Sequence, residues 1–342
     1  MPFVQPAFTR IVGGTGPKDA RIMLIGEALG SEEQRLGKPF CGPAGSVLDQ
    51  CLHAAGIIRS HVYITNVVKL HPRNNDITPF FQEGKGKQLP HFTEEGAKWV
   101  EKLWQEIDEV KPNVIVPLGN TAMCALTGMA RVMKYRGYVM ESSDGRFKVI
   151  PTIHPSASLR GSYIYRYYIT ADLRKAVLES EFPEVRRPDR ELVYSFNGPL
   201  DAVRWIDSLA AEPRLGFDIE VLNYGISCIG ISPRPNLAVS IPLADGYWGS
   251  DPARELPIWR ALDRLLSNEK VEKVFQNGSF DIQFLASDCG MIVRGPIKDT
   301  MIAHSLWYPD MLKGLGFLGS LYCGAQEYWK DMVRFDDIKE ES

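Results

Sequence analysis

The first half of the chain alternates short apolar runs with stretches in which apolar residues recur at helical spacing. Residues 22–25, 61–69 and 114–118 are apolar or β-branched runs of the kind that forms buried strands. Residues 93–110 and 164–178 place apolar side chains three and four positions apart, which predicts helices with one buried face. Because strands and helices alternate, we expect an α/β/α domain with a mostly parallel sheet and helices on both of its faces.

The second half is also α/β, but its strand spacing is different. Residues 181–190 are rich in proline and charge, which is typical of a linker between domains. Three strand-like runs with the spacing of an antiparallel meander follow, at 215–221, 226–232 and 237–241. We therefore expect two domains, residues 1–180 and residues 191–342, the second with a mixed sheet.

The composition fits a folded protein with two domains. A length of 342 residues corresponds to about two domains, and 44% hydrophobic residues can fill two cores. The N-terminus has no secretory or transit-like pattern, and no apolar run reaches transmembrane length, so we expect a cytoplasmic protein, in the host cell cytoplasm if it is viral. The six cysteines form no CxxC pair, which argues against a zinc site or a disulfide framework.

The formal net charge of −3 hides an asymmetry between the two halves. Residues 1–180 contain 22 Lys or Arg and 17 Asp or Glu, a balance of +5, whereas residues 181–342 contain 17 and 25, a balance of −8. Neither half is basic enough to identify a nucleic-acid partner from charge alone. The acidic half would suit divalent metals, although such a surplus also occurs on ordinary solvated faces.

Polar residues stand where the strands of the first half end. Glu27, Asn66 and His154 lie at the ends of the expected strands, and Phe40 lies on the loop after the first strand. Carboxyl ends of parallel strands meet at one edge of a sheet, so these side chains are expected to share a crevice. Together they suit cleavage of an N-glycosidic bond. An aromatic ring stacks on an extruded base, an amide reads its edge, a carboxylate handles water and a histidine stabilises the departing base anion.

Each of these residues also has an ordinary structural explanation. Glu27 could be a solvated loop residue and Asn66 could close a turn. Phe40 could belong to the core, and His154 before a proline could be a satisfied structural histidine. Taken singly, the residues favour these explanations, so the order and spacing of the motifs must decide.

Taken in order, the motifs resemble those of the uracil-DNA glycosylase superfamily, closest to its family-4 type. The matching stretches are 26–30 (GEALG, like GEAPG), 37–45 (GKPFCGPAG, like GxPFVGxAG), 65–69 (TNVVK) and 154–156 (HPS) with Leu159 and Arg160 of its intercalation loop. The resemblance covers roughly residues 20–176, which makes chance unlikely. It implies the following roles: base stacking for Phe40, base reading for Asn66, leaving-group stabilisation for His154, water handling for Glu27, and DNA contact for Ser156 and Arg160.

Two departures from the family pattern matter. Leu29 stands where the family has proline, so the turn that positions water is expected to be altered. Family-4 enzymes carry four cysteines that bind an iron–sulfur cluster, but here Leu70 replaces one, Trp99 or a neighbour replaces another, and the N-terminus has no CxxC. We therefore expect no iron–sulfur cluster.

A glycine- and lysine-rich stretch, residues 84–91 (GKGKQLPH), lies in the expected long loop 71–91. It faintly resembles a basic loop that in some relatives ends in a nucleophilic histidine. Phosphate contact by Lys85 and Lys87 is the better-supported interpretation, because lysines bind the DNA backbone without reading its sequence.

A second group of carboxylates lies in the second half. Asp218 and Glu220 are two residues apart on a strand, so both side chains point to the same face. With Asp281 near the start of a helix, they could hold Mg²⁺ or Mn²⁺ for hydrolysis of a phosphodiester. Alone, a DxE pair on a half-exposed strand is more often a solvated polar face.

These carboxylates occur in motifs that resemble the 3′–5′ proofreading exonuclease of family A DNA polymerases, which has a ribonuclease H-like fold. Asp218 and Glu220 match its first motif, and Asn277 with Asp281 matches the second, NxxFD. Residues 298–304 with 315–322 resemble the stretch that begins DTM, whose aspartate is usually structural. The third motif, YxxxD, is not found, so we expect the exonuclease domain to be truncated before its last metal-binding acid.

The sequence thus predicts the N-terminal part of a phage-type DNA polymerase, in which a uracil-DNA glycosylase-like domain is joined to an exonuclease domain. The expected partners are uracil-containing DNA and single-stranded 3′ ends, with a separate polymerase chain as a further partner. The alternative is a catalytically degenerate module that binds DNA or uracil within a replisome. Leu29 and the missing third acid favour that alternative, and the retained catalytic residues favour an enzyme.

Overall fold

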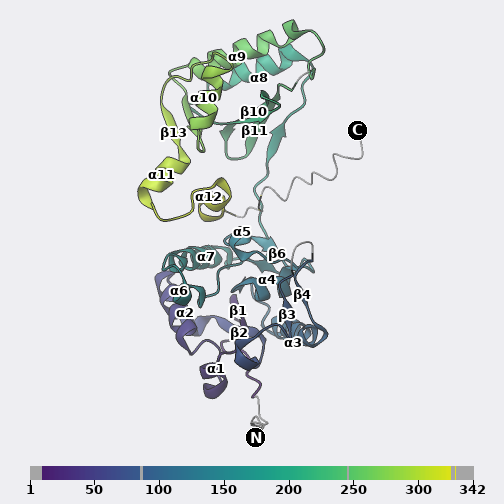
Figure 1. The fold of residues 1–342 in the computed structure, drawn as a ribbon, viewed down its shortest axis with the longest axis vertical. Coiled ribbons are helices and arrows are strands. Elements are labelled where there is room, and N and C mark those ends of the chain that lie inside the picture. The colour runs from purple at the N-terminus through teal and green to yellow at the C-terminus, as the bar shows by residue number, and fades with distance from the viewer. Residues whose placement is uncertain (1–9, 85–87, 245, 325–327, 329–342) are drawn as a thin grey trace. The chain divides into compact units, whose positions relative to one another are not determined.

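The computed structural model describes residues 10–84, 88–244, 246–324 and Tyr328. The chain forms two compact units (Figure 1). The first comprises Met1–Arg187 and Gly316–Ser342, and the second comprises Pro188–Leu315. The chain therefore leaves the first unit, builds the whole second unit and then returns to the first.

The first unit is built around a five-stranded sheet in the order β2-β1-β5-β7-β6. Its strands are β1 (Ile22–Ala28), β2 (Tyr63–Val68), β5 (Val114–Pro117), β6 (Met140–Glu141) and β7 (Lys148–Val149). All neighbours pair in parallel except β6 and β7, which are antiparallel. The expected α/β domain with a mostly parallel sheet is confirmed.

Helices of the first unit bury the apolar faces that their sequences predict. They are α1 (Ser31–Leu36), α2 (Pro43–Ala54), α3 (Glu94–Val110), α4 (Asn120–Thr127), α5 (Val132–Tyr135), α6 (Ala157–Arg160) and α7 (Tyr165–Glu179). In α3, the Thr93 hydroxyl accepts a hydrogen bond from the Gly96 N–H at 3.1 Å, which caps the helix. The buried face of α3 carries Trp99, Leu103 and Ile107.

The loop expected over residues 71–91 is not without regular structure. It contains β3 (Phe81–Gln82), which pairs antiparallel with β4 (His91–Phe92) just beyond it. Strands of two residues produce no detectable alternation in the sequence, and their pairing depends on the buried Phe81 side chain. Lys85 and Lys87 lie outside the described residues.

The second unit contains a six-stranded mixed sheet in the order β13-β12-β9-β10-β11-β8. Its strands are β8 (Glu191–Val193), β9 (Arg214–Leu222), β10 (Gly225–Arg234), β11 (Leu237–Pro242), β12 (Glu272–Phe275) and β13 (Ile297–Asp299). The meander β9-β10-β11 is antiparallel, and the outer pairs are parallel, so the expected mixed sheet is confirmed.

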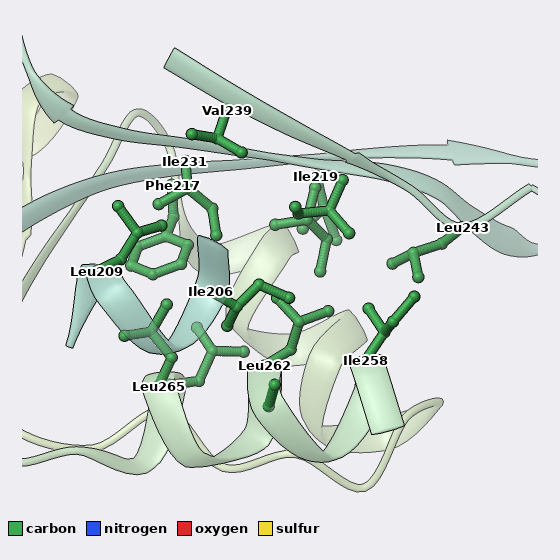
Figure 2. Packing of buried hydrophobic residues seen from close by; sticks show 14 of the residues in the cluster. Ile206, Leu209, Phe217, Ile219, Ile231, Val239, Leu243, Ile258, Leu262 and Leu265 are labelled. Carbon is green, nitrogen blue, oxygen red and sulfur yellow. The ribbon is translucent and has the colours of Figure 1, made fainter. Parts of the chain in front are cut away.

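One face of this sheet is packed by two helices (Figure 2). The helices of the second unit are α8 (Pro199–Leu209), α9 (Leu256–Ser267), α10 (Ser279–Ser287) and α11 (Thr300–Trp307). Phe217 and Ile219 of β9 point into the core beside Ile206 of α8 and Leu262 of α9. Alternation along β9 therefore turns Asp218 and Glu220 to the opposite face of the sheet.

The last described helix, α12 (Leu315–Tyr322), belongs with the first unit from Gly316 onward. The expected exonuclease domain, residues 191–342, included this segment. Its position differs from that expectation because its contacts are made with side chains that lie more than 140 residues earlier, as the hydrogen bond from Lys175 to Ser320 illustrates.

Candidate active sites

Three of the expected site residues lie at one edge of the first sheet. Gly26 of β1 pairs with Asn66 of β2, so Glu27 and Asn66 are neighbours at the carboxyl ends of parallel strands. The chain reaches His154 just after Thr152, whose carbonyl oxygen accepts a hydrogen bond from the Gly119 N–H at 2.9 Å. The topology therefore brings together residues that are far apart in the sequence, Glu27 and His154 being separated by 127 positions.

A pocket of about 380 Å³ opens at this edge. The expected residues that line it are Glu27, Phe40, Asn66, His154, Ser156 and Arg160. Its volume is in the range of small-molecule sites, and it can accept a single nucleobase. The structure thus gathers all six residues that the sequence assigned to the first site within the described part of the chain.

Phe40 forms one wall of the pocket in an unusual backbone conformation. Its φ is +51°, its side chain is buried, and its ring centroid lies 5.7 Å from that of His154. A Cβ atom on Gly26 would lie 2.2 Å from Asn66 Oδ1 and 2.5 Å from the Phe40 ring. Glycine is therefore required at position 26 for the ring and the amide to approach each other.

Asn66 is buried, but its Oδ1 atom is unpartnered in the described residues. A buried oxygen without a donor costs about 1–3 kcal/mol, so such an atom is uncommon unless it serves a ligand. An amide also offers N–H donors beside its oxygen. Asn66 is therefore equipped to read a base edge that presents a donor next to an acceptor.

His154 is held as a neutral imidazole. Its Nδ1 atom accepts a hydrogen bond from the Ser156 N–H at 3.2 Å and lies 2.8 Å from Ser156 Oγ. A backbone N–H can only donate, so the ring proton is on Nε2. Burial, helped by the positive charge of Arg160, lowers the pKa of His154 to about 4. At neutral pH the ring can therefore donate from Nε2 without carrying a charge.

Glu27 is held by a residue that the sequence analysis did not identify. The Thr121 hydroxyl, at the start of α4, donates a hydrogen bond to Glu27 Oε2 at 2.5 Å. Thr121 is buried, so this contact fixes the carboxylate from the protein side. The available signal was its position just after β5, the same location relative to a strand as the other site residues.

The three expected acids of the second unit lie on two neighbouring elements, Asp218 and Glu220 in β9 and Asp281 in α10. Asp281 in the first turn of α10 is buried and accepts a hydrogen bond from the Ile219 N–H, in β9, at 3.0 Å. Partial burial, followed by the charges of Asp281 and Glu220, raises the pKa of Asp218 to about 6. Burial also raises the pKa of Asp281. The negative charges of Asp281 and Glu220 therefore disfavour ionisation of Asp218.

The acids do not form a complete metal site by themselves. Within the described residues, no group of three or more His, Cys, Asp or Glu side chains converges closely enough to hold a metal ion. Asp281 already gives one oxygen to the β9 backbone, and Glu220 is exposed. The expected set Asp218, Glu220 and Asp281 therefore does not fit a divalent ion without a further ligand.

Asp299 and Asn277 have structural positions in this unit. Asp299 caps α11 by accepting from the Met301 and Ile302 N–H groups at 2.8 and 3.2 Å. It also accepts from the N–H groups of Asn277 and Gly278. These backbone hydrogen bonds offset its partial burial and lower the pKa of Asp299. The Asn277 side chain, at a φ of +60°, is exposed.

Two family profiles match different parts of the chain. Residues 14–173 match the profile of the uracil DNA glycosylase superfamily. The type-4 uracil-DNA glycosylase of Thermotoga maritima is 40% identical over 172 residues, which are 49% of this chain and 82% of that protein. The chain belongs to the uracil-DNA glycosylase superfamily. A type-4 relative from Archaeoglobus fulgidus is 37% identical over 160 residues, covering 44% of this chain and 73% of the relative.

The superfamily region is fused to an exonuclease region. Residues 199–336 match the profile of a 3′–5′ exonuclease. The DNA polymerase of Bacillus phage SP01 is 27% identical over 324 residues, which cover 86% of this chain and 33% of the polymerase. The protein is thus a glycosylase-superfamily and exonuclease fusion similar to a phage DNA polymerase, and it spans about a third of that polymerase's length. Both matched families are hydrolases that act on DNA, and this chain is an enzyme of that class.

Solved structures similar to the chain include Escherichia coli RNase D, an exoribonuclease, with a TM-score of 0.32 at 14% identity over 43% of this chain and 36% of that chain. The EXD2 exonuclease domain soaked in Mn and GMP gives a TM-score of 0.27 at 20% identity over 42% of this chain and 75% of that chain.

In the described part of the protein, no helix is both long enough and apolar enough to cross a bilayer.

Leu29 and Leu70, which differ from the family-4 glycosylase pattern, contact each other. The Leu29 N–H donates to the Leu70 carbonyl oxygen at 3.3 Å, a hydrogen bond that proline at position 29 could not make. His71 Nδ1 lies 2.9 Å from the Leu29 carbonyl oxygen. The turn that follows Glu27 is therefore held by a different set of bonds from the one a proline would allow.

Apolar side chains surround the positions at which family-4 members have cluster-binding cysteines. Leu70 and Trp99 belong to one hydrophobic cluster, together with Phe80 and Phe92. We expect purified full-length protein to contain less than about 0.1 iron per chain, because thiolates are the ligands of such clusters. Metal analysis and the visible absorbance spectrum would check this. Stoichiometric iron with acid-labile sulfide would contradict the expectation.

Proposed function

We propose that the first unit hydrolyses the N-glycosidic bond of uracil in DNA. The observation that carries the proposal is the combination, in one pocket, of an unpartnered Asn66 oxygen and a neutral His154 whose Nε2 carries the proton. Uracil presents an N–H donor between two carbonyl acceptors. Its edge therefore complements an amide, and the negative charge that forms on its oxygen as the bond breaks needs a donor.

Each pocket residue is given one role in this proposal. The base leaves the DNA stack and lies on the Phe40 ring, and Asn66 Oδ1 accepts from uracil N3–H. As the glycosidic bond breaks, His154 Nε2–H donates to the base oxygen on which charge accumulates, without transferring its proton. Glu27, fixed by Thr121, stabilises the positive charge on the sugar and orients the water that attacks the sugar carbon. As the new C–O bond forms, Glu27 accepts the proton of the water, and the base leaves as an anion.

The flanking DNA is assigned to residues at the pocket mouth. Arg160 is exposed, and its guanidinium donates to Ser156 Oγ at 3.3 Å, so it can reach a phosphate from the pocket wall. Ser156 offers a hydroxyl and lines the pocket. Lys85 and Lys87, which lie outside the described residues, remain predicted phosphate contacts. The substrate is uracil-containing DNA, and the protein acts in the cytoplasm of the cell in which that DNA is copied.

The experiment that tests this function uses the full chain and needs no metal. Single-stranded DNA with one uracil should acquire an alkali-labile site when incubated with an excess of protein in the presence of a chelator. Gel analysis after alkali treatment measures the product, and DNA with thymine at the same position is the control. If no cleavage at the uracil occurs under single-turnover conditions, the proposed activity is wrong.

We propose further that the second unit contributes to 3′–5′ exonuclease chemistry in an assembled protein. Asp218, Glu220 and Asp281 are the acids for Mg²⁺ or Mn²⁺, and Asn277 contacts the DNA strand. The raised pKa of Asp218 supports this assignment, because part of it is caused by the negative charges of Asp281 and Glu220, which a divalent cation would offset. A further acid is required, and we assign it to a polymerase segment or to a separate polymerase chain.

Trimming of 3′ ends by this chain alone is therefore expected to be weak or absent. Labelled single-stranded DNA incubated with Mg²⁺ or Mn²⁺ should show little shortening on a denaturing gel, and Asp218→Ala should abolish any that occurs. Robust processive trimming by the wild-type chain would show that the site is complete without a further acid. Trimming that survives Asp218→Ala would assign the activity elsewhere or to a contaminant.

The similarity to a phage polymerase supports a place for this fusion in DNA synthesis. In that setting, the first unit acts on uracil in the template or product strand, and the second acts on 3′ ends. The alternative of a catalytically degenerate binding module predicts uracil-specific DNA binding without cleavage. Binding and cleavage measured on the same uracil-containing strand distinguish the two.

A further inference from the structure

Sequence similarity assigns helix α12 to the exonuclease region, whereas its contacts in the structure assign it to the first unit. The exonuclease profile matches residues 199–336, a range that includes α12. In the structure, residues from Gly316 onward belong to the first unit, the glycosylase-superfamily unit. A segment of the exonuclease stretch therefore docks on the other unit's surface.

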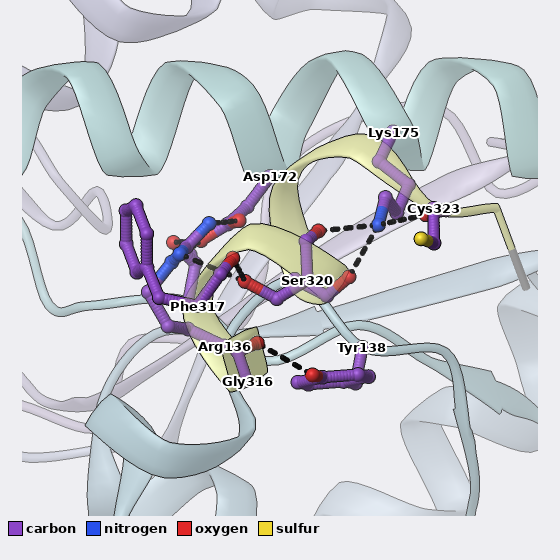
Figure 3. Close-up of polar contacts among 10 residues, drawn as sticks. Arg136, Tyr138, Asp172, Lys175, Gly316, Phe317, Ser320 and Cys323 are labelled. Atoms are coloured by element: carbon purple, nitrogen blue, oxygen red, sulfur yellow. Dashed lines mark hydrogen bonds and ion pairs between the residues drawn. The ribbon is translucent and has the colours of Figure 1, made fainter. Parts of the chain in front are cut away.

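Lys175 holds the C-terminal end of α12. Its Nζ atom donates to the carbonyl oxygens of Ser320 and Cys323 at 2.5 and 2.8 Å, and to that of Gly137 at 2.8 Å (Figure 3). The last carbonyl groups of a helix have no partner within the helix and carry partial negative charge. An ammonium group with three donors matches them in number and in charge.

Arg136 holds the middle of α12 from a fully buried position. Its Nη1 atom donates to Ser320 Oγ at 3.1 Å, while its Nε atom donates to Asp172 Oδ2 at 2.9 Å. The Phe317 ring lies 5.0 Å from the Arg136 guanidinium and 4.9 Å from the Tyr168 ring. Asp172 balances the charge of Arg136, so the first unit supplies a neutral, rigid pair that faces α12.

Two close approaches show that the fit is specific in shape. Tyr138 Oη donates to the Gly316 carbonyl oxygen at 2.5 Å, and a Cβ atom on Gly319 would lie 3.1 Å from the same Oη atom. At Gly137, whose φ is +72°, a Cβ atom would lie 2.6 Å from Asp172 Oδ1 and 3.0 Å from the Ser320 carbonyl oxygen. Glycine on both sides of the contact therefore allows the backbones to meet.

Removal of α12 would leave buried donors without acceptors. Lys175 would lose two of its three carbonyl partners, and Arg136 Nη1 would lose Ser320 Oγ. Unpaired charged donors in a protein interior are costly, and the Leu318 side chain, now buried, would be exposed. The surface of the first unit is thus built for this occupant and not for water.

We propose that Arg136, Tyr138, Tyr168 and Lys175 form a docking socket for α12 that fastens the exonuclease unit to the glycosylase unit at a second point. The first point is the covalent connection near residues 181–190. The second is non-covalent and comes after the last residue of the second unit along the chain, because the chain returns to the first unit at Gly316. The socket is therefore an interaction surface whose partner is residues 316–323 of this chain.

The proposal is tested by cutting the first connection. A specific protease site is inserted between Pro188 and Asp189, where the chain is exposed, and the purified full chain is cleaved there. The two fragments should then co-elute in size-exclusion chromatography at micromolar concentration. Separation of two folded wild-type fragments, each with a cooperative thermal transition, would overturn the proposal.

Variants in α12 leave the four socket residues unchanged. Phe317→Ala and Gly319→Leu should each raise the dissociation constant of the cleaved pair by about tenfold or more. Phe317 is an aromatic anchor of the kind that carries much of the binding energy of an interface, and a leucine side chain at position 319 would collide with Tyr138 Oη. Leu315→Ala, at a half-exposed position of the same helix, is the matched control and should have no measurable effect. Co-elution that is equally strong in all three variants would overturn the assignment to α12.

A readout in the uncut chain covers the case in which a fragment fails to fold. Backbone amides of residues 318–323 should be protected from hydrogen exchange in the wild type, and Lys175→Met should reduce that protection at least tenfold. Lys98→Met, which removes an exposed lysine from α3, is the control and should leave the exchange of these amides unchanged. Equal exchange in wild type and Lys175→Met would contradict the proposal.

Discussion

Replacing His154 with alanine should lower the single-turnover rate of uracil excision by about 10²- to 10³-fold, because one donor to a developing oxyanion contributes that much. The neutral ring lines the pocket and carries its proton on Nε2, because Nδ1 accepts from the Ser156 N–H. The rate is measured with alkali-treated gels at saturating protein, so that a change in DNA affinity does not enter. His53→Ala, which removes an exposed histidine from α2, is the matched control and should retain the wild-type rate.

The protonation state of His154 gives this prediction a second readout. Its pKa of about 4 means that the ring does not titrate between pH 5 and 8, so no break in the pH–rate profile near 6.5 is expected from it. The lowered pKa of His154 also makes the free energy of unfolding depend on pH. The unfolded chain takes up the proton first as the pH falls from 6.5 towards 4, so the free energy of unfolding decreases over that range. His154→Ala should lack this component. A wild-type rate in His154→Ala, or a rate that titrates near pH 6.5 only when His154 is present, would contradict the assigned role.

Replacing Asn66 with alanine should lower the rate of uracil excision by about 10²-fold and remove its dependence on the N3–H group of the base. The reason is that Oδ1 is a buried acceptor, and the loss of its hydrogen bond to the base costs about 1–3 kcal/mol. DNA with N3-methyluracil tests the same contact from the substrate side, since the methyl group removes the donor. The wild type should excise uracil at least tenfold faster than N3-methyluracil, and Asn66→Ala should excise both at similar rates.

This comparison has a built-in control, because both substrates have the same glycosidic bond and place the same carbonyl oxygen near His154. Far-ultraviolet circular dichroism and the melting temperature of Asn66→Ala would show that the pocket strand β2 is intact. If Asn66→Ala still discriminates against N3-methyluracil, then another group reads the base edge and the assignment of Asn66 is wrong.

The architecture of the first unit was predictable because its three central strands β1, β2 and β5 are buried along most or all of their length. The runs at 22–25, 61–69 and 114–118 became β1, β2 and β5, and the parallel order followed from the helices between them. The pocket could be predicted for the same reason, since parallel strands end at one edge. Helix α3 was marked by its cap and by an apolar stripe, which are local features.

Features that depend on distant contacts could not be predicted. Thr121 reaches Glu27 from another strand–helix connection, and nothing near Thr121 in the sequence indicates its partner. Strand β8 is three residues long and pairs with β11, whose residues lie 46 positions further along the chain, since Leu237 pairs with Glu191. Helix α12 was assigned to the exonuclease domain from its motif, and its docking partners Arg136 and Lys175 carry no local signal for it.

The hydrogen bond between Leu29 and Leu70 also constrains how the sequence can evolve. Proline at position 29 would leave the Leu70 carbonyl oxygen without its donor, at a cost of about 1 kcal/mol or more. Cysteine at position 70 would keep the backbone bond but place a thiol among apolar side chains with no metal partners. Because the acceptor is a backbone oxygen, this cost applies to proline at position 29 whichever side chain stands at position 70, so a proline in this turn would need a new donor for the Leu70 carbonyl oxygen.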